Sequence, residues 1–251
     1  MASDFPDHFS AVATAYATAR PTYPAALADW LAAASPRRQR AWDVGCGNGQ
    51  LTGLLATRFE HVVATDASAA QIAAAAPLDG VTYAVAPAEA SEVPAGSCDL
   101  IVAAQAAHWF NLPAFLVEAR RVARPGALLA LICYCHADVG DPALRAVLDR
   151  FARDIAGPYW PPERAMVDDG YRDVVLGLPA VAAPALAIRH RWNLAQLIAY
   201  LGTWSATSAL RRAVGDAPWV AAQHELADAW GDPAASRDVR WPLAIVAGRF
   251  G

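Results

Sequence analysis

Ala41-Trp42-Asp43-Val44-Gly45-Cys46-Gly47-Asn48-Gly49-Gln50-Leu51 is the stretch that decides the fold. Its first residues are typical of a buried strand, and three glycines at alternate positions follow. Glycine tolerates positive φ and has no Cβ, so a strand can turn tightly into a helix while the backbone approaches a ligand. Leu51, Leu54, Leu55 and Phe59 then recur at helical spacing. The stretch predicts a strand, a glycine loop and a helix, with the loop binding a nucleotide-type cofactor.

The glycine spacing differs from the dinucleotide-binding fingerprint. In G-x-G-x-x-G the third glycine lets a helix approach the pyrophosphate, and this chain has Gln50 at that position. A dinucleotide is therefore disfavoured as the ligand. The glycine triplet alone is equally typical of an ordinary tight turn, so the interpretation depends on residues elsewhere.

Strand and helix patterns alternate on both sides of this loop. Further apolar runs at 61–66, 81–86, 99–104 and 127–134 predict strands, separated by helical patterns. Two more strands are expected at 184–192 and 239–249, although Pro242 lacks an amide hydrogen and regular pairing should start just after it. The alternation predicts a doubly wound, mostly parallel, seven-stranded α/β sheet with a helical cap.

The chain is expected to divide into four segments. We predict an N-terminal helical lid at 1–39, an α/β core at 40–135, a helical cap with one core strand at 136–236, and the last core strand at 237–251. In the lid segment, Pro24 should open a helix that Pro36 closes. Ahead of it, Tyr16 and Arg20 occur as Tyr-x-x-x-Arg-Pro-x-Tyr-Pro, which could fold over the cofactor.

An acid ends the second predicted strand. Asp66 lies 21 residues after Gly45, where a carboxylate can accept hydrogen bonds from both hydroxyls of a ribose. Ser68 to Gln71 already provide a capping box for the next helix. We therefore expect the carboxylate of Asp66 to bind the ligand and not to cap the helix.

These motifs in combination resemble the class I S-adenosylmethionine-dependent methyltransferases. The residues that carry the resemblance, over about 40–135, are Asp43-x-Gly45-x-Gly47-x-Gly49, Asp66, Ala88-Glu89, Asp99 and Arg124-Pro125-Gly126. Two positions depart from the family pattern: Pro87 stands where an acid is common, and Ala127 replaces the second glycine of a pair. The resemblance implies S-adenosylmethionine as cofactor and S-adenosylhomocysteine as product. The cofactor contacts it implies are Asp43, Gly45, Cys46, Gly47, Asp66, Ala67, Ala88, Glu89 and Gln105, joined by Tyr16 and Arg20.

Looser motifs extend the resemblance over most of the chain. The N-terminal Tyr-x-x-x-Arg-Pro-x-Tyr-Pro segment, Ala107-His108-Trp109-Phe110 and Thr203-Trp204-Ser205 look like the trans-aconitate methyltransferase-like (methyltransferase type 11) branch. That branch implies a small-molecule acceptor, typically a carboxylate that is esterified. The open alternatives are O-, N- or C-methylation of an aromatic or quinone-like metabolite, a non-catalytic S-adenosylmethionine-binding module, and a dinucleotide-dependent oxidoreductase.

Methyl transfer from a sulfonium is an in-line displacement that mainly needs aligned reactants in a dry site. A carboxylate acceptor is already charged at neutral pH and needs no base. A phenol or amine would benefit from one, and His108 is the histidine expected at the sheet mouth. The alternative, a loop histidine with a structural hydrogen bond, stays open.

Aromatic and basic residues suggest the acceptor side of the site. Trp109 is a candidate pocket wall through cation-π contact with a sulfonium, although it could equally be core. Tyr159 and Trp160 are candidate substrate contacts in the cap. Arg164 or Arg172 offers a bidentate grip on an acid, with surface solvation as the alternative.

Composition narrows the function classes. The chain has 251 residues, 56% of them hydrophobic, and a net charge of -4, so it offers no basic field for nucleic acid. It contains no lysine, which excludes Schiff-base chemistry. Its four cysteines lack paired metal-ligand spacing, so we expect no metal. Without a signal-like start or an apolar run of about 18 residues, we expect a cytoplasmic monomer or homodimer with no membrane partner.

Overall fold

Seven strands form one sheet in the computed structural model, which describes residues 20–251. The strand order is β3-β2-β1-β4-β5-β7-β6, and the first five strands are parallel. β7 runs antiparallel to both of its neighbours. The bounds are β1 Arg40–Val44, β2 His61–Asp66, β3 Val81–Val85, β4 Cys98–Ala104, β5 Ala123–Tyr134, β6 Ala187–Trp192 and β7 Arg237–Arg249. The predicted fold class, a mostly parallel seven-stranded sheet with helices, is confirmed.

The central strands are apolar on both faces because helices cover both sides of the sheet. On β4, Leu100 and Val102 pack on the side of α2 (Ala25–Ala34) and α3 (Thr52–Ala56). The alternate residues Ile101 and Ala103 pack on the opposite side with α5 (Leu112–Val122). Each side therefore has its own hydrophobic core, and the period-two alternation of a strand divides the residues between them.

Buried charge fixes the starts of the central strands. Asp99 is fully buried and accepts hydrogen bonds from the amides of Gln39 and Arg40, at 2.9 and 3.0 Å. The guanidinium of Arg124 forms an ion pair with it at 3.1 Å. Two residues of the family motif, Asp99 and Arg124, thus join β1, β4 and β5 at the sheet edge that lies away from the carboxyl ends of these strands.

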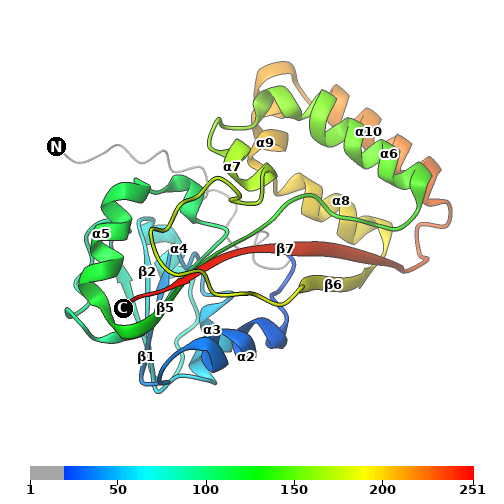
Figure 1. The fold of residues 1–251 in the computed structure, drawn as a ribbon. Helices are drawn as coiled ribbons and strands as arrows, with labels where there is room; N and C mark the ends of the chain where they lie inside the picture. Colours follow the sequence, from blue (N-terminus) through cyan, green and yellow to red (C-terminus); the bar gives the residue numbers. More distant parts are fainter. Residues whose placement is uncertain (1–19) are drawn as a thin grey trace.

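A helical cap stands beside the sheet, over the end of β7 that is distant from the C-terminus (Figure 1). It contains α6 Pro142–Arg150, a π-helical turn at Phe151–Ile155, a 3₁₀ turn at Gly157–Tyr159, α7 Arg164–Asp168, α8 Leu194–Gly202, α9 Ser205–Val214 and α10 Ala217–Trp230. Asn193 and Gln196 form a capping box on α8. The helices at 164–168 and 205–214 were not anticipated from sequence. The division into lid, core, cap and last strand stays a prediction.

The long strand β7 changes partner at Pro242. Residues 237–242 pair with β6, and residues 243–249 pair with β5. The prediction that regular pairing starts after Pro242 was therefore wrong for the β6 side, where Ala187 lies opposite Pro242, and correct for the β5 side. The missing amide hydrogen is tolerated because Pro242 lies at the end of the β6 ladder.

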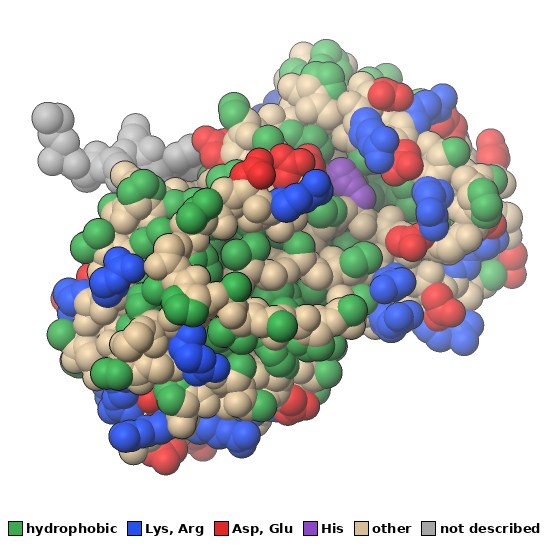
Figure 2. All heavy atoms as spheres, viewed as in Figure 1, with side chains coloured by type: hydrophobic (Ala, Val, Ile, Leu, Met, Phe, Trp, Pro, Cys, Tyr) green, Lys and Arg blue, Asp and Glu red, His purple; other side chains and the backbone are tan. Residues whose placement is uncertain are grey.

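Arginine and acidic side chains are interspersed on the face shown in Figure 2, where they lie mostly around the margin of an uncharged middle. None of the helices within residues 20–251 is long and apolar enough to span a membrane. The same residues contain no group of three histidine, cysteine or acidic side chains that could hold a metal ion.

Candidate functional site

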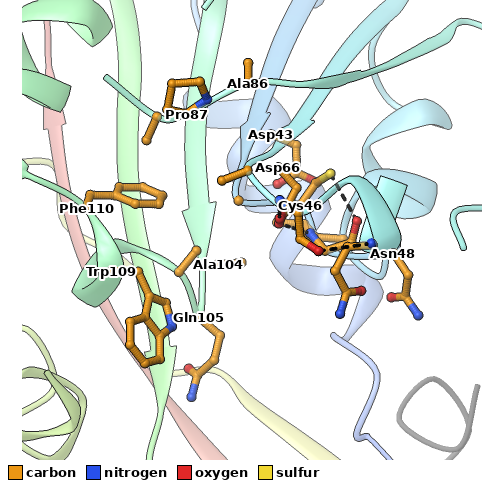
Figure 3. A pocket seen from close by; sticks show the side chains of 18 of the residues that line it. Asp43, Cys46, Asn48, Asp66, Ala86, Pro87, Ala104, Gln105, Trp109 and Phe110 are labelled. Atoms are coloured by element: carbon orange, nitrogen blue, oxygen red, sulfur yellow. Dashed lines mark hydrogen bonds between the residues drawn. The ribbon is translucent and has the colours of Figure 1, made fainter. Parts of the chain in front are cut away.

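A cavity of about 870 Å³ lies at the carboxyl ends of β1, β2 and β4. This is where an open α/β sheet places its ligand. Figure 3 shows Asp43, Cys46 and Asp66 on one side of the cavity, with Trp109 and Phe110 facing them. Of the residues predicted from sequence, the structure brings the following to its wall: Arg20, Asp43, Gly45, Cys46, Gly47, Asp66, Ala67, Ala88, Glu89, Gln105 and Trp109.

A second, much smaller cavity of about 50 Å³ adjoins the first. Arg20, Gln105 and Trp109 line both. The residues that line only the small one are His108, Trp160, Pro161, Arg164 and Ser205.

Other predicted contacts are not brought to these cavities. Tyr159 packs against the hydrophobic core in a 3₁₀ turn and lines neither cavity. Arg172 is exposed, so solvation accounts for it. Tyr16 lies outside the described residues.

The glycine loop forms the floor of the large cavity. Gly45, Gly47 and Gly49 all have positive φ, between 57° and 91°. A Cβ on Gly45 would lie 2.5 Å from the Cβ of Ala106, and one on Gly49 would lie 2.7 Å from the hydroxyl of Tyr83. The predicted left-handed turn is thus confirmed, and neighbouring protein atoms also leave no room for a Cβ at Gly45 and Gly49. The close approach of this backbone to a ligand stays a prediction.

Asp66 holds the loop as well as facing the cavity. One carboxylate oxygen accepts a hydrogen bond from the amide of Gly47 and the other from the amide of Ser68, each at 2.8 Å. Ser68 caps α4 (Ala69–Ala73), since its hydroxyl accepts a bond from the amide of Gln71 at 3.4 Å. The predicted capping box was wrong in its other half, because the amide of Ser68 donates to Asp66 and not to the Gln71 side chain. These two amides orient the carboxylate of Asp66.

The large cavity is acidic. Asp43 is buried and accepts a 2.6 Å hydrogen bond from the hydroxyl of Thr52. Burial raises the pKa of Asp43 to about 7; the bond from Thr52 opposes this rise and the charge of Asp66 adds to it. Within the described part of the chain, the cavity wall has three carboxyl groups, those of Asp43, Asp66 and Glu89, and one guanidinium, that of Arg20. This balance suits a cationic ligand and disfavours a pyrophosphate.

The cavity fits S-adenosylmethionine, the ligand that the resemblance implies. Its volume lies within the roughly 300–1,000 Å³ of small-molecule sites. Val85, Pro87 and Phe110 give an apolar wall for a flat base. In addition, the side-chain amide nitrogen of Gln50 is buried there without a hydrogen-bond partner among residues 20–251. A buried donor of this kind needs an acceptor, and an amino-acid carboxylate would provide one.

Backbone strain is concentrated at the site. Gln105 and Tyr171 have positive φ, 57° and 56°, and no other non-glycine residue in the described part of the chain does. The Gln105 side chain is locked on the backbone of Tyr134, donating to its carbonyl at 3.1 Å and accepting from its amide at 2.9 Å. Strained residues persist only where surrounding structure holds them, which is typical of functional sites.

His108 is neutral and hydrogen-bonded. Burial, together with the charges of Arg164 and Arg20, lowers the pKa of His108 to about 4. Its Nδ1 lies 2.9 Å from the hydroxyl of Tyr171. The imidazole tautomer decides which of the two atoms donates: His108 presents an N–H at Nε2 if the hydroxyl donates, and a lone pair there if Nδ1 donates. The role of His108 as a general base stays a prediction.

Sequence reasoning missed Tyr134, which also lines the large cavity. Its hydroxyl lies 3.5 Å from Nη1 of Arg20. A signal was available, because Tyr134 is the last residue of a central strand and the ligand site of such sheets lies at the carboxyl ends of strands.

The known proteins to which this chain is similar are methyltransferases. The family described as "Methyltransferase domain" matches residues 42–131, which contain the glycine loop, Asp66 and Trp109. A protein of Dictyostelium discoideum described as a methyltransferase is 32% identical over 212 residues, covering 83% of this chain and 81% of its own length. A methyltransferase of Mycobacterium tuberculosis is 35% identical over 125 residues, 49% of this chain and 51% of that one.

One solved structure is similar throughout. A protein of Anaeromyxobacter dehalogenans described as a type II methyltransferase is 47% identical, with a TM-score of 0.86. The match covers 92% of this chain and 97% of that chain, so it includes the cap as well as the sheet.

Proposed function

Because the chain belongs to the class I S-adenosylmethionine-dependent methyltransferases, we propose that it methylates a carboxylate oxygen of a small molecule. One observation carries the choice of acceptor. Among residues 20–251, the charged side chains at the small cavity are Arg20 and Arg164, neither of which can serve as a general base, and Nδ1 of the adjoining His108 is already 2.9 Å from the hydroxyl of Tyr171. An acceptor that is already deprotonated at neutral pH needs no general base, and a carboxylate is such an acceptor.

The residues of the large cavity would hold the cofactor, which when bound supplies an electrophilic methyl group on a positively charged sulfur. Asp66 would accept bonds from the ribose hydroxyls, and Gln50 would donate to the amino-acid carboxylate. Glu89, and Asp43 in its ionised form, add negative charge opposite a cation. Trp109 and Phe110, on the facing wall, offer aromatic faces to a sulfonium.

The chain's part in the reaction is to position the reactants and to exclude water from the site. Gln105, held at both ends of its amide by Tyr134, gives a rigid wall between the two cavities. Rigid walls favour alignment of acceptor oxygen, methyl carbon and sulfur, from which most of the rate of such a displacement comes. The resemblance to the trans-aconitate methyltransferase-like branch supports an ester as the product.

The test is transfer of a labelled methyl group from S-adenosylmethionine into a small-molecule extract of the source cells. Mild base should then release the label as methanol, because only a methyl ester is hydrolysed under these conditions. Label that resists base would identify an ether, amine or carbon methyl and so refute the carboxylate. With no incorporation, while S-adenosylhomocysteine still binds and NADH does not, the chain would be a binding module.

A further inference from the structure

The two adjoining cavities have opposite charge. The large one is lined by Asp43, Asp66 and Glu89. Among residues 20–251, the small one is lined by the guanidinium groups of Arg20 and Arg164 and by no acidic side chain. A site that is negative around the cofactor and positive beside it discriminates between ligands by charge at both ends.

Arg164 is fixed for a role inside the cavity. Its side chain is only 14% exposed, and its guanidinium lies over the Trp160 ring at 4.5 Å from the ring centre. Nε donates to Asp168 at 2.9 Å, and Nη2 lies 3.4 Å from Nε2 of His136. Nη1 has no hydrogen-bond partner within residues 20–251. The guanidinium of Arg164 is therefore fixed on two sides and still has N–H donors that can bind an anion.

His108 is a second polar side chain of the small cavity. Its Nδ1 lies 2.9 Å from the hydroxyl of Tyr171, and its Nε2 has no hydrogen-bond partner within residues 20–251. Tyr171 is itself buried and adopts positive φ, so the fold holds this phenol under the imidazole at a cost in backbone strain. Ser205, at the start of α9, adds a hydroxyl.

We infer that the small cavity is an anion-binding subsite, in which Arg164 and His108, the latter as the tautomer that is protonated at Nε2, hold a carboxylate-sized anionic group of the acceptor. At about 50 Å³ the cavity has room for one small group. Arg164 and His108 line the small cavity but not the large one. The anionic group that they hold is therefore separate from the atom that is methylated. The acceptor is therefore a small molecule with an anionic anchor separate from its reacting group. The inference rests on the proposed small-molecule transfer, but not on the reacting group being a carboxylate.

The first test uses the labelled product made from cell extract. If the acceptor has a separate anchor, the methylated product keeps a negative charge and binds an anion-exchange resin at neutral pH. An anionic product that resists base would refute the carboxylate ester and still support the subsite. A neutral product would overturn the subsite, whatever its behaviour in base.

The second test uses Arg164→Gln, with Arg172→Gln as the matched control at an exposed position. Loss of a charge-assisted bond should raise the extract concentration that gives half-maximal labelling by about 10- to 100-fold. S-adenosylhomocysteine affinity should stay unchanged in both variants, which also shows that they are folded. Equal half-maximal concentrations in wild type and Arg164→Gln would overturn the inference.

A third measurement does not depend on turnover. In the presence of saturating S-adenosylhomocysteine, succinate should quench tryptophan fluorescence of the wild type, because Trp109 and Trp160 line the small cavity. The neutral succinamide should not, and succinate should lose its effect in Arg164→Gln. If succinate and succinamide act alike on the wild type, the cavity does not select an anion and the inference fails.

Discussion

At the scale of the residue, the glycine loop depends on Gly45, which has no Cβ. Gly45 lies where β1 turns, and its φ of 65° is unfavourable for any side chain. It also faces Ala106, on the segment that follows β4, so closely that a Cβ would lie 2.5 Å away. Cβ atoms do not approach so closely, and the loop or the wall of the cavity would have to move.

Gly45→Ala should therefore weaken S-adenosylhomocysteine binding by tenfold or more, on the order of 1.4 kcal/mol or above. Isothermal titration calorimetry measures the affinity. Gly96→Ala is the matched control, since Gly96 has a similar φ of 58° but no atom within 4 Å of the added Cβ. It should lose stability through backbone strain and keep its affinity; a similar loss of affinity in both variants would show that crowding at Gly45 is irrelevant.

At the scale of the element, α5 holds the loop that carries part of the cavity wall. Glu118 is buried and accepts hydrogen bonds from the amide and hydroxyl of Ser91, at 2.8 and 2.6 Å. Arg121 pairs with Glu118 and donates to the carbonyl of Val93 at 2.8 Å. The loop between β3 and β4 is thus joined to one helix, and the same loop brings Glu89 to the cavity.

The bonds from Arg121 and Ser91 lower the pKa of Glu118 from 4.5 to about 2. The folded-state pKa lies below the unfolded one, so the stabilisation is fully present above about pH 4.5 and is lost as the pH falls through 2. Arg121 is 40% exposed, so we expect a discounted contribution of about 2 kcal/mol.

Glu118→Gln should lower the free energy of unfolding by about that amount at pH 7 and by much less near pH 2.5. Urea denaturation at the two pH values measures the difference. Glu92→Gln, an exposed change in the same loop, should have little effect at either pH. An equal loss from Glu118→Gln at both pH values would mean that ionisation of Glu118 plays no part.

At the scale of the whole molecule, β7 is the element that joins the sheet to the cap. Its first half pairs with β6 and its second half with β5. In the first half, Trp241 is fully buried and packs edge-on against Trp192 and Tyr200, with ring centres 4.8 and 5.3 Å apart. Its Nε1 also donates to the hydroxyl of Tyr200, on α8, at 3.2 Å.

Trp241→Ala should destabilise the protein by about 3–5 kcal/mol, because it leaves a large cavity in this aromatic cluster. We expect one unfolding transition, shifted to lower urea, by both fluorescence and circular dichroism. Trp241→Phe keeps an aromatic ring but loses the bond to Tyr200, and should cost clearly less. Two separated transitions in the wild type would instead show that sheet and cap unfold independently.

The sequence by itself determined the sheet and the cofactor loop. Apolar runs buried on both faces define the strands, and the glycine positions follow from backbone sterics, so both depend on local rules. The sequence also placed Asp66, Glu89 and Gln105 at the cavity, because they follow the carboxyl ends of strands.

Only the tertiary structure decided the acceptor side of the site. Tyr171 lies 63 residues from His108 along the chain, and its hydroxyl lies 2.9 Å from Nδ1 of that histidine. The sequence offered Arg164 and Arg172 equally as candidates to bind an acid. In the structure Arg164 packs on Trp160 and its side chain is only 14% exposed, whereas Arg172 is exposed. The sequence also did not indicate which strands pair with each half of β7, because a strand pattern does not specify the neighbouring strand. Contacts of this kind depend on how distant segments pack, which no local pattern encodes.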